Sequence, residues 1–188
     1  MGVCKALLAY RGTAFVDHVI SAARSVVEDV VLLGGSEWNT PGSTGLPRLA
    51  DEPDSGGPLA GLVPLLEHAG ERWALLIACD MPLIDGVMLR RLLAAADEAL
   101  DAVAFCVSNE GGEHFPCCAL FSPRVVGPAR SELARSRGIH ALLGRIRCRV
   151  LEATAGEAHR LSNVNTPDEF AELLRSTGQP TATGAFVL

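Results

Sequence analysis

The chain has 188 residues, enough for one domain with a substantial core, and 48% of them are hydrophobic although only 5% are aromatic. The net charge of −6 at pH 7 argues against a protein that binds nucleic acid mainly by electrostatic attraction. No apolar run reaches the ~18 residues of a membrane span, and the start shows no signal-peptide pattern. The six cysteines form no C-x-x-C pair, so we expect reduced thiols and a cytoplasmic protein.

Helical and strand patterns alternate along the chain, which predicts an α/β fold. Strands are expected at residues 30–33, 46–49, 73–79, 102–107, 115–121 and 148–151. Helices are expected at residues 15–26, 59–68, 87–100, 125–135, 139–146 and 167–175. No repeat and no domain linker interrupts this order, so we expect a single domain over residues 1–175 followed by a flexible tail at 176–188.

The helix boundaries are predicted from capping residues. Thr13 and Asp85 each precede an apolar helical pattern and are expected to be N-caps. Thr166 and Glu169 have the spacing of a capping box before the last helix. Pro64 lies inside the second helix, where its missing N–H should kink the helix or end its first turn early.

Asp80 follows the apolar run of residues 73–79, which has no polar alternation and is typical of a strand buried on both faces. Pro82 ends that strand. Ligands of parallel sheets bind beyond the carboxyl ends of the strands, where a carboxylate suits a Mg²⁺ ion that carries nucleotide phosphates. The alternative is that Asp80 only caps a strand–helix turn, and this segment alone does not separate the two.

Five short motifs occur in a characteristic order. They are Met1-Gly2-Val3-Cys4-Lys5, Asp51 with Gly57-Pro58-Leu59-Ala60-Gly61, Cys79-Asp80-Met81-Pro82, His114-Phe115-Pro116 and Asn163-Val164-Asn165-Thr166-Pro167. In order and spacing they resemble the molybdenum cofactor guanylyltransferases, the MobA-type nucleotidyltransferases. The resemblance covers about residues 1–175, and the second and fifth motifs together are its most specific part.

This resemblance implies a Rossmann-like three-layer sandwich with a mostly parallel sheet. It also implies transfer of GMP from GTP to the phosphate of molybdopterin with release of pyrophosphate, without nucleic acid or membrane as a partner. The attacking group is already an anion, so alignment and charge neutralisation suffice and no general base is needed. In the family pattern Asp80 binds Mg²⁺ and, with Lys5, forms the catalytic pair on the triphosphate.

Other residues have both a functional and a structural interpretation. Asp51 stands where the family has a carboxylate near the nucleotide, or it is an exposed loop residue. Gly57 and Gly61 allow a nucleotide to approach a helix N-terminus, or they are turn and packing glycines. Asn163 and Asn165 share one face of an extended segment, where they bind the acceptor or cap the last helix. His114 fits the family's His-Pro pair only loosely, and a structural role is favoured.

Two features depart from the family pattern. Members carry a strand and a glycine-rich loop just before the Met-Gly-x-x-Lys motif. Either in-frame upstream codons encode these elements, or the protein lacks most of its phosphate cradle. The chain as given is expected to expose apolar strand edges near Leu32 and Leu76. Gly34-Gly35-Ser36 replaces a segment used near the base. Three interpretations remain open: a guanylyltransferase, a related nucleotidyltransferase with another base or acceptor such as a cytidylyltransferase, and a non-catalytic protein that binds a pterin or a partner. Oligomeric state is not predicted.

Overall fold

The computed structural model describes residues 4–34, 38–53, 55–109, 112–114, 117–136 and 138–176. Met1-Gly2-Val3, Gly35-Ser36, Phe115-Pro116, the side chain of His114 and the tail after residue 176 lie outside the described structure. The expectations that concern them remain predictions.

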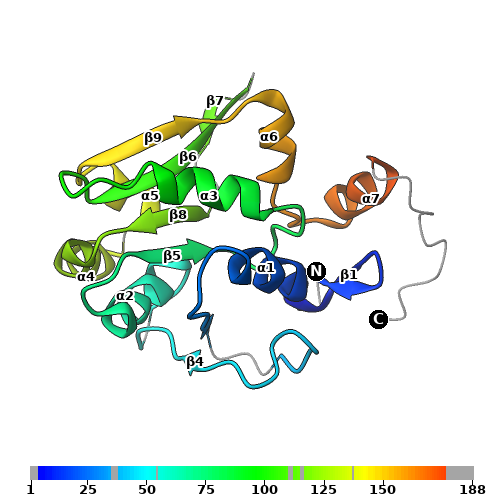
Figure 1. Cartoon of the computed structure of the whole chain (residues 1–188), viewed down its shortest axis with the longest axis horizontal. Coiled ribbons are helices and arrows are strands. Elements are labelled where there is room, and N and C mark those ends of the chain that lie inside the picture. Colours follow the sequence, from blue (N-terminus) through cyan, green and yellow to red (C-terminus); the bar gives the residue numbers. More distant parts are fainter. Residues whose placement is uncertain are drawn as a thin grey trace.

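The main sheet has strand order β5-β8-β6-β9, formed by Ala74–Ile77, Cys118–Phe121, Ala102–Asn109 and Cys148–Glu152. The strands β5, β6 and β9 run in one direction and β8 runs antiparallel between two of them. A short strand, β7 (Gly112–His114), forms a hairpin with the end of β6. Figure 1 shows these strands stacked in this order. The expected α/β class is confirmed, and the sheet is mixed because of β8.

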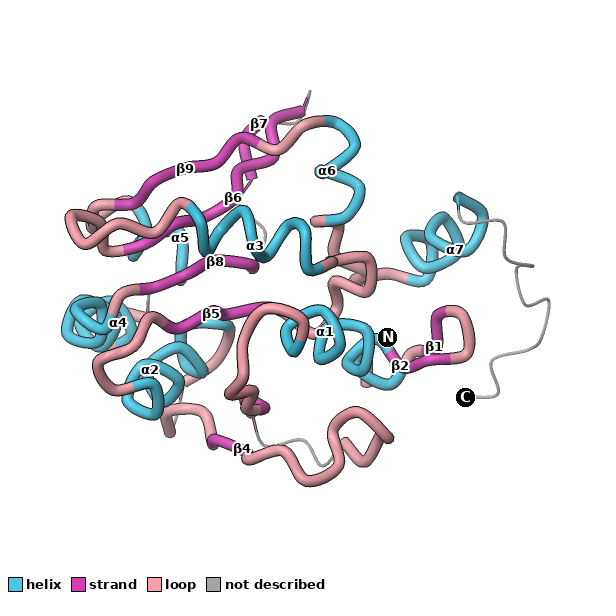
Figure 2. Tube along the Cα trace, in the orientation of Figure 1, coloured by secondary structure: helices cyan, strands magenta, loops and turns pink. Residues whose placement is uncertain are grey.

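Two small strand pairs lie outside the main sheet. The strand β3 (Leu32–Leu33) pairs in parallel with β4 (Arg48–Leu49), at the two positions expected for short strands. The strands β1 (Ala9–Tyr10) and β2 (Thr13–Ala14) form a hairpin. Figure 2 shows β4 apart from β5 on the lower side of the molecule.

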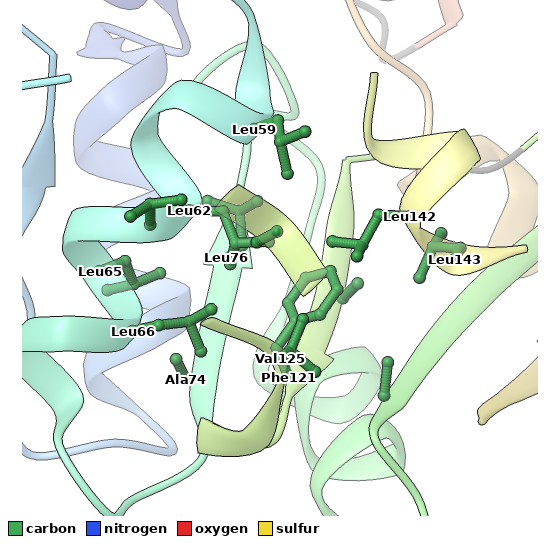
Figure 3. Close-up of a cluster of buried hydrophobic side chains, with 14 of the residues drawn as sticks. Leu59, Leu62, Leu65, Leu66, Ala74, Leu76, Phe121, Val125, Leu142 and Leu143 are labelled. Carbon is green, nitrogen blue, oxygen red and sulfur yellow. The ribbon is translucent and has the colours of Figure 1, made fainter. Parts of the chain in front are cut away.

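Helices cover both faces of the sheet (Figure 1). On one face α2 (Pro58–Ala69), α4 (Val126–Leu133) and α5 (Ile139–Leu143) pack on Ala102 and Ala104 of β6. On the other face α1 (Phe15–Arg24) and α3 (Gly86–Ala94) pack on Val103 and Phe105. Successive β6 residues therefore face opposite helix layers, which explains why this strand is apolar without alternation. Figure 3 shows the first of these two cores.

Two helix predictions need correction. Thr13 does not cap the first helix, because it lies in β2 and α1 starts at Phe15 without a side-chain cap. Pro64 does not end its helix early, since α2 continues to Ala69. The carbonyl of Ala60, which an N–H at position 64 would have bonded, instead accepts the backbone N–H of Glu52 at 3.1 Å. That bond removes part of the energetic cost of the proline.

Other boundaries agree with the capping signals. The Asp85 carboxylate accepts the N–H groups of Val87 and Met88, each at 3.0 Å, so Asp85 is confirmed as the N-cap of α3. That helix ends at Ala94, earlier than its apolar pattern indicates. A further helix, α6 (Ala155–Arg160), was not predicted, although Thr154 and Glu157 form its capping box. Within the described residues, no helix is long and apolar enough to cross a membrane.

Candidate active site

Four polar side chains from distant parts of the sequence meet where β5 ends. The Lys5 ammonium lies 3.8 Å from Oδ2 of Asp80 and donates to Oδ1 of Asn165 at 2.6 Å. The other carboxylate oxygen of Asp80, Oδ1, accepts the Nδ2 amide of Asn163 at 2.6 Å. The Asp80 side chain is 14% exposed and that of Lys5 is 37% exposed, so both groups are accessible to a ligand. We call these four residues the Asp80 cluster.

The backbone fixes the two asparagines beside Asp80. The N–H of Val164 donates to the carbonyl of Asp80 at 2.9 Å, which joins this segment to the end of β5. Val164 itself is buried with Leu8, Tyr10 and Phe15. Because side chains alternate along an extended segment, the residues on either side of Val164 both face the cluster.

The last helix supports the same segment. In α7 (Pro167–Ser176), Glu169 accepts the backbone N–H groups of Asn165 at 2.5 Å and Thr166 at 2.9 Å. The N–H of Glu169 donates to Oγ1 of Thr166 at 3.1 Å, which completes the predicted capping box. Because Thr166 caps the helix, the Asn165 side chain is not needed as a cap. Its amide oxygen is used to hold the Lys5 ammonium.

Lys5 begins a short 3-10 turn, Lys5–Leu7. The next residue, Ala6, is 1% exposed and packs with Val16, Ile20 and Leu32. This packing fixes the backbone next to Lys5, and it therefore holds the Lys5 side chain near Asp80.

Asp51 lies next to two glycines on a second wall of the site. A Cβ at Gly61 would lie 3.2 Å from Oδ1 of Asp51 and 3.3 Å from the Leu33 side chain, so the glycine at 61 leaves room for both. A Cβ at Gly34 would lie 3.5 Å from Oδ2 of Asp51. Gly57, the N-cap of α2, has φ of +77° and ψ of −179°, a backbone conformation that L residues rarely adopt. The structure thus gives both Gly57 and Gly61 a local reason to be glycine.

A cavity of about 590 Å³ opens between these two walls, and its lining includes Asp51, Gly57, Gly61 and Asp80. Its middle is apolar and runs between β3 and β5. A nucleotide triphosphate carries several negative charges and does not suit that apolar middle. The part of the cavity beside Asp51 and Asp80 is therefore the candidate site for a nucleotide.

The thiols near Asp80 do not carry the chemistry. Burial, and after it the neighbouring Asp80 carboxylate, raises the pKa of the Cys79 thiol to about 11. Burial likewise raises the pKa of the Cys117 thiol to about 12. The raised pKa values disfavour the thiolate form near neutral pH, so neither thiol is poised as a nucleophile.

The residues present fit a Mg²⁺ ion that is bound chiefly through its substrate. Within the described part of the chain, no three His, Cys, Asp or Glu side chains converge as a metal site. Mg²⁺ is commonly held by one or two carboxylates together with phosphate oxygens and waters, which Asp80 can provide. Among the described residues, the contact of Oδ2 of Asp80 is with the Lys5 ammonium at 3.8 Å, longer than a hydrogen bond, so this oxygen can accept a metal ion.

The structure brings together residues that were expected to act separately. Asn163 and Asn165 were expected to bind the acceptor or to cap the last helix, and in the structure they contact Asp80 and Lys5 directly. Sequence spacing does not show this, because the contacts depend on the bond between Val164 and Asp80. The sequence predicted Glu169 as part of a capping box, but it did not predict that Glu169 also accepts the backbone N–H of Asn165.

A model of one protein family, the MobA-like NTP transferase domain, matches residues 1–152. The chain belongs to this family. The match includes Lys5, Asp51, Gly57, Gly61 and Asp80, and it ends before the asparagines. The five sequence motifs had indicated the same family, so that prediction is confirmed.

Individual MobA-like relatives cover most of the chain. A molybdenum cofactor guanylyltransferase of Pseudomonas entomophila is 32% identical over 167 residues, covering 87% of this chain and 85% of that protein. A molybdenum cofactor biosynthesis bifunctional protein of Synechocystis is 28% identical over 92% of this chain, which spans only half of that relative's length. The structure of molybdopterin-guanine dinucleotide biosynthesis protein A from Archaeoglobus fulgidus has a TM-score of 0.72 at 17% identity, covering 94% of this chain and 92% of that one. The structural likeness shows a shared fold.

Proposed function

We propose that this protein transfers GMP from GTP to the phosphate of molybdopterin and releases pyrophosphate. The observation that carries the proposal is the Asp80 cluster, which joins a cation, a carboxylate and two amides at the carboxyl end of a sheet strand. Membership of the MobA-like NTP transferases and the names of the full-length relatives support this reaction.

In the proposed reaction, a phosphate oxygen of molybdopterin attacks the α-phosphorus of GTP. A new P–O bond forms there, and the bond from that phosphorus to the bridging oxygen breaks, so the electron pair leaves with pyrophosphate. The nucleophile is an anion that needs no deprotonation, and catalysis rests on alignment and on positive charge near the phosphates.

Each residue of the cluster has a proposed task. Lys5 places a point charge beside the triphosphate, and Asn165 holds its ammonium in position. Asp80 holds Mg²⁺, and Asn163 orients that carboxylate through Oδ1 while Oδ2 faces the ligand. When bound, Mg²⁺ supplies positive charge to the phosphate oxygens. The free amide atoms of the two asparagines are placed to bond the acceptor phosphate or pterin.

Asp51 is proposed to face the nucleoside part of GTP. A carboxylate repels phosphates, so its useful partners are donors such as ribose hydroxyls or guanine N–H groups. Its place near the N-terminus of α2, between Gly34 and Gly61, supports this role. We also propose a cytoplasmic location, which the six free cysteines support.

The test is a product assay with purified protein, molybdopterin, Mg²⁺ and either GTP or CTP. Chromatography should show a guanine dinucleotide form of the cofactor and one pyrophosphate for each molecule formed. The reaction with CTP should be much slower. A product with CTP and none with GTP would make the guanine assignment wrong, and no product with either would contradict the proposed transfer.

A further inference from the structure

Trp38 lies on the wall of the cavity of about 590 Å³, close to the Asp80 cluster. Its side chain packs against the small hydrophobic cluster that contains Ala6, the neighbour of Lys5. Cys79, the neighbour of Asp80, packs against the same cluster. Trp38 is only partly buried, and it lines the cavity as well as this cluster. Its indole ring therefore stands between a packed core and the candidate nucleotide site.

The indole N–H of Trp38 is a donor without an acceptor. Within the part of the chain that the structure describes, its Nε1 atom is buried and has no hydrogen-bond partner. A donor in this state has lost its bond to water and has gained no bond in the protein, which costs free energy. Phenylalanine would fill an apolar wall without this cost. Packing alone therefore does not account for tryptophan at this position, whereas an acceptor on a ligand does.

The backbone at Trp38 is held in place, although the ring forms no hydrogen bond. The carbonyl of Trp38 accepts the hydroxyl of Ser43 at 3.0 Å and also the guanidinium of Arg48. The same loop is joined to α1, because the hydroxyl of Thr40 donates to the carboxylate of Asp17. With the backbone fixed, the indole can turn about its side-chain bonds into the cavity without movement of the loop. Such a turn exposes Nε1 to a ligand.

The surroundings of Trp38 suit an aromatic base better than a phosphate. Ala14 and Leu46 pack against the same cluster, so the wall around the indole is apolar. An apolar wall favours a planar base and disfavours charged phosphates, for which Lys5 already provides a cation. An indole N–H can donate but cannot accept. It therefore suits the edge of guanine that carries the acceptors O6 and N7, whereas cytosine has an amino donor on the corresponding edge.

We propose that Trp38 selects the base of the bound nucleotide. Its indole turns into the cavity, and its N–H donates to the edge of guanine that carries O6 and N7. Asp51, which lines the same cavity, remains available for the N–H groups of guanine or for the ribose. The inference rests on the proposed use of GTP, and it adds a residue that favours guanine over cytosine.

The experiment compares Trp38→Phe with the matched control Trp73→Phe. Phenylalanine keeps an aromatic ring and removes the N–H. Trp73 is the other tryptophan of the chain, and it lines the cavity at the opposite end of β5 from Asp80. Calorimetry with Mg-GTP, Mg-CTP and magnesium triphosphate measures the Kd of each. Trp38→Phe should raise the Kd for GTP by about threefold to tenfold and leave the Kd for CTP and for triphosphate nearly unchanged. Trp73→Phe should leave all three unchanged.

Two further measurements separate a contact with the base from a packing role. The thermal midpoint of Trp38→Phe should equal or exceed that of the wild type, because the variant removes a buried donor without an acceptor. In Trp73→Phe, Trp38 is the remaining tryptophan, and its fluorescence emission should change on addition of Mg-GTP and not on addition of magnesium triphosphate.

Equal Kd values for GTP in the wild type and in Trp38→Phe would overturn the inference and leave the proposed function in place. An equal loss of affinity for GTP and for triphosphate would show that the N–H serves the phosphates, which also contradicts a role in base selection. A lower thermal midpoint with unchanged binding would show that Trp38 serves packing alone. If the wild type binds no Mg-GTP, the proposed function fails and the inference fails with it.

Discussion

Replacement of Asn163 by alanine should weaken the binding of Mg-GTP even though this residue was first expected to serve the acceptor. The amide of Asn163 donates to Oδ1 of Asp80 at 2.6 Å, and within the described part of the chain no second side chain bonds that oxygen. Without the amide, the carboxylate loses the contact that fixes its rotation. We therefore expect the effect to act through Asp80.

The size of the effect follows from the kind of bond and its exposure. A hydrogen bond to a charged group contributes about 1.5–3 kcal/mol, which corresponds to roughly 10- to 150-fold in affinity. The Asp80 side chain is 14% exposed, so water can replace part of the lost donor. We expect the Kd for Mg-GTP to rise by about tenfold, near the lower limit.

Isothermal titration calorimetry with Mg-GTP measures this change, and Ser162→Ala is the matched control. Ser162 is adjacent in sequence, but its hydroxyl donates to the carbonyl of Ala158 at 3.2 Å and lies outside the Asp80 cluster. Equal affinities of Asn163→Ala and Ser162→Ala for Mg-GTP would refute the reasoning. A thermal melt of both variants confirms that the comparison is between folded proteins.

Three further changes have defined outcomes. Lys5→Met should raise the Kd for Mg-GTP by roughly tenfold or more in calorimetry, because it removes the cation of the Asp80 cluster, and Lys5→Arg should restore part of the affinity. Gly57→Ala should lower the free energy of unfolding by about 1–3 kcal/mol in urea titration, since φ at this position is +77°. Hydrogen bonds from Arg147 hold the pKa of Asp101 well below its usual range. Asp101 therefore stabilises the fold fully at pH values above its unfolded-state pKa of about 4. This contribution is lost as the pH falls through the lower pKa of the folded state. Asp101→Ala should therefore cost about 2 kcal/mol at pH 7 and progressively less below pH 4.

Much of the fold could be predicted because its strands are buried on both faces. A strand such as β6 is apolar at successive positions, which marks it in the sequence, and caps such as Asp85 mark the next helix. Thr13 was misread because the same residue type suits a cap and a hairpin strand, and only tertiary contacts separate the two. That α2 continues past Pro64 could not be predicted, because the hydrogen bond from Glu52 to Ala60 is not local in sequence.

The site residues could be named from motifs, but their contacts could not. Lys5 and Asn165 are 160 residues apart, and nothing in their spacing indicates a hydrogen bond between them. Apolar strand edges were expected to be exposed near Leu32 and Leu76, but both side chains are buried and line the cavity beside β5. Its closure by helices on both sides depends on packing that periodicity does not reveal.

The rate of pyrophosphate release from GTP and molybdopterin in Asp80→Asn, compared with Asp85→Asn, tests the central claim most directly. Both changes replace one carboxylate by an amide within the same loop, and asparagine can still cap α3 at position 85. The account predicts that Asp85→Asn keeps most of the wild-type rate, whereas Asp80→Asn loses Mg²⁺-dependent release while remaining folded. Wild-type rates in Asp80→Asn would contradict the assignment of the Asp80 cluster as the active site.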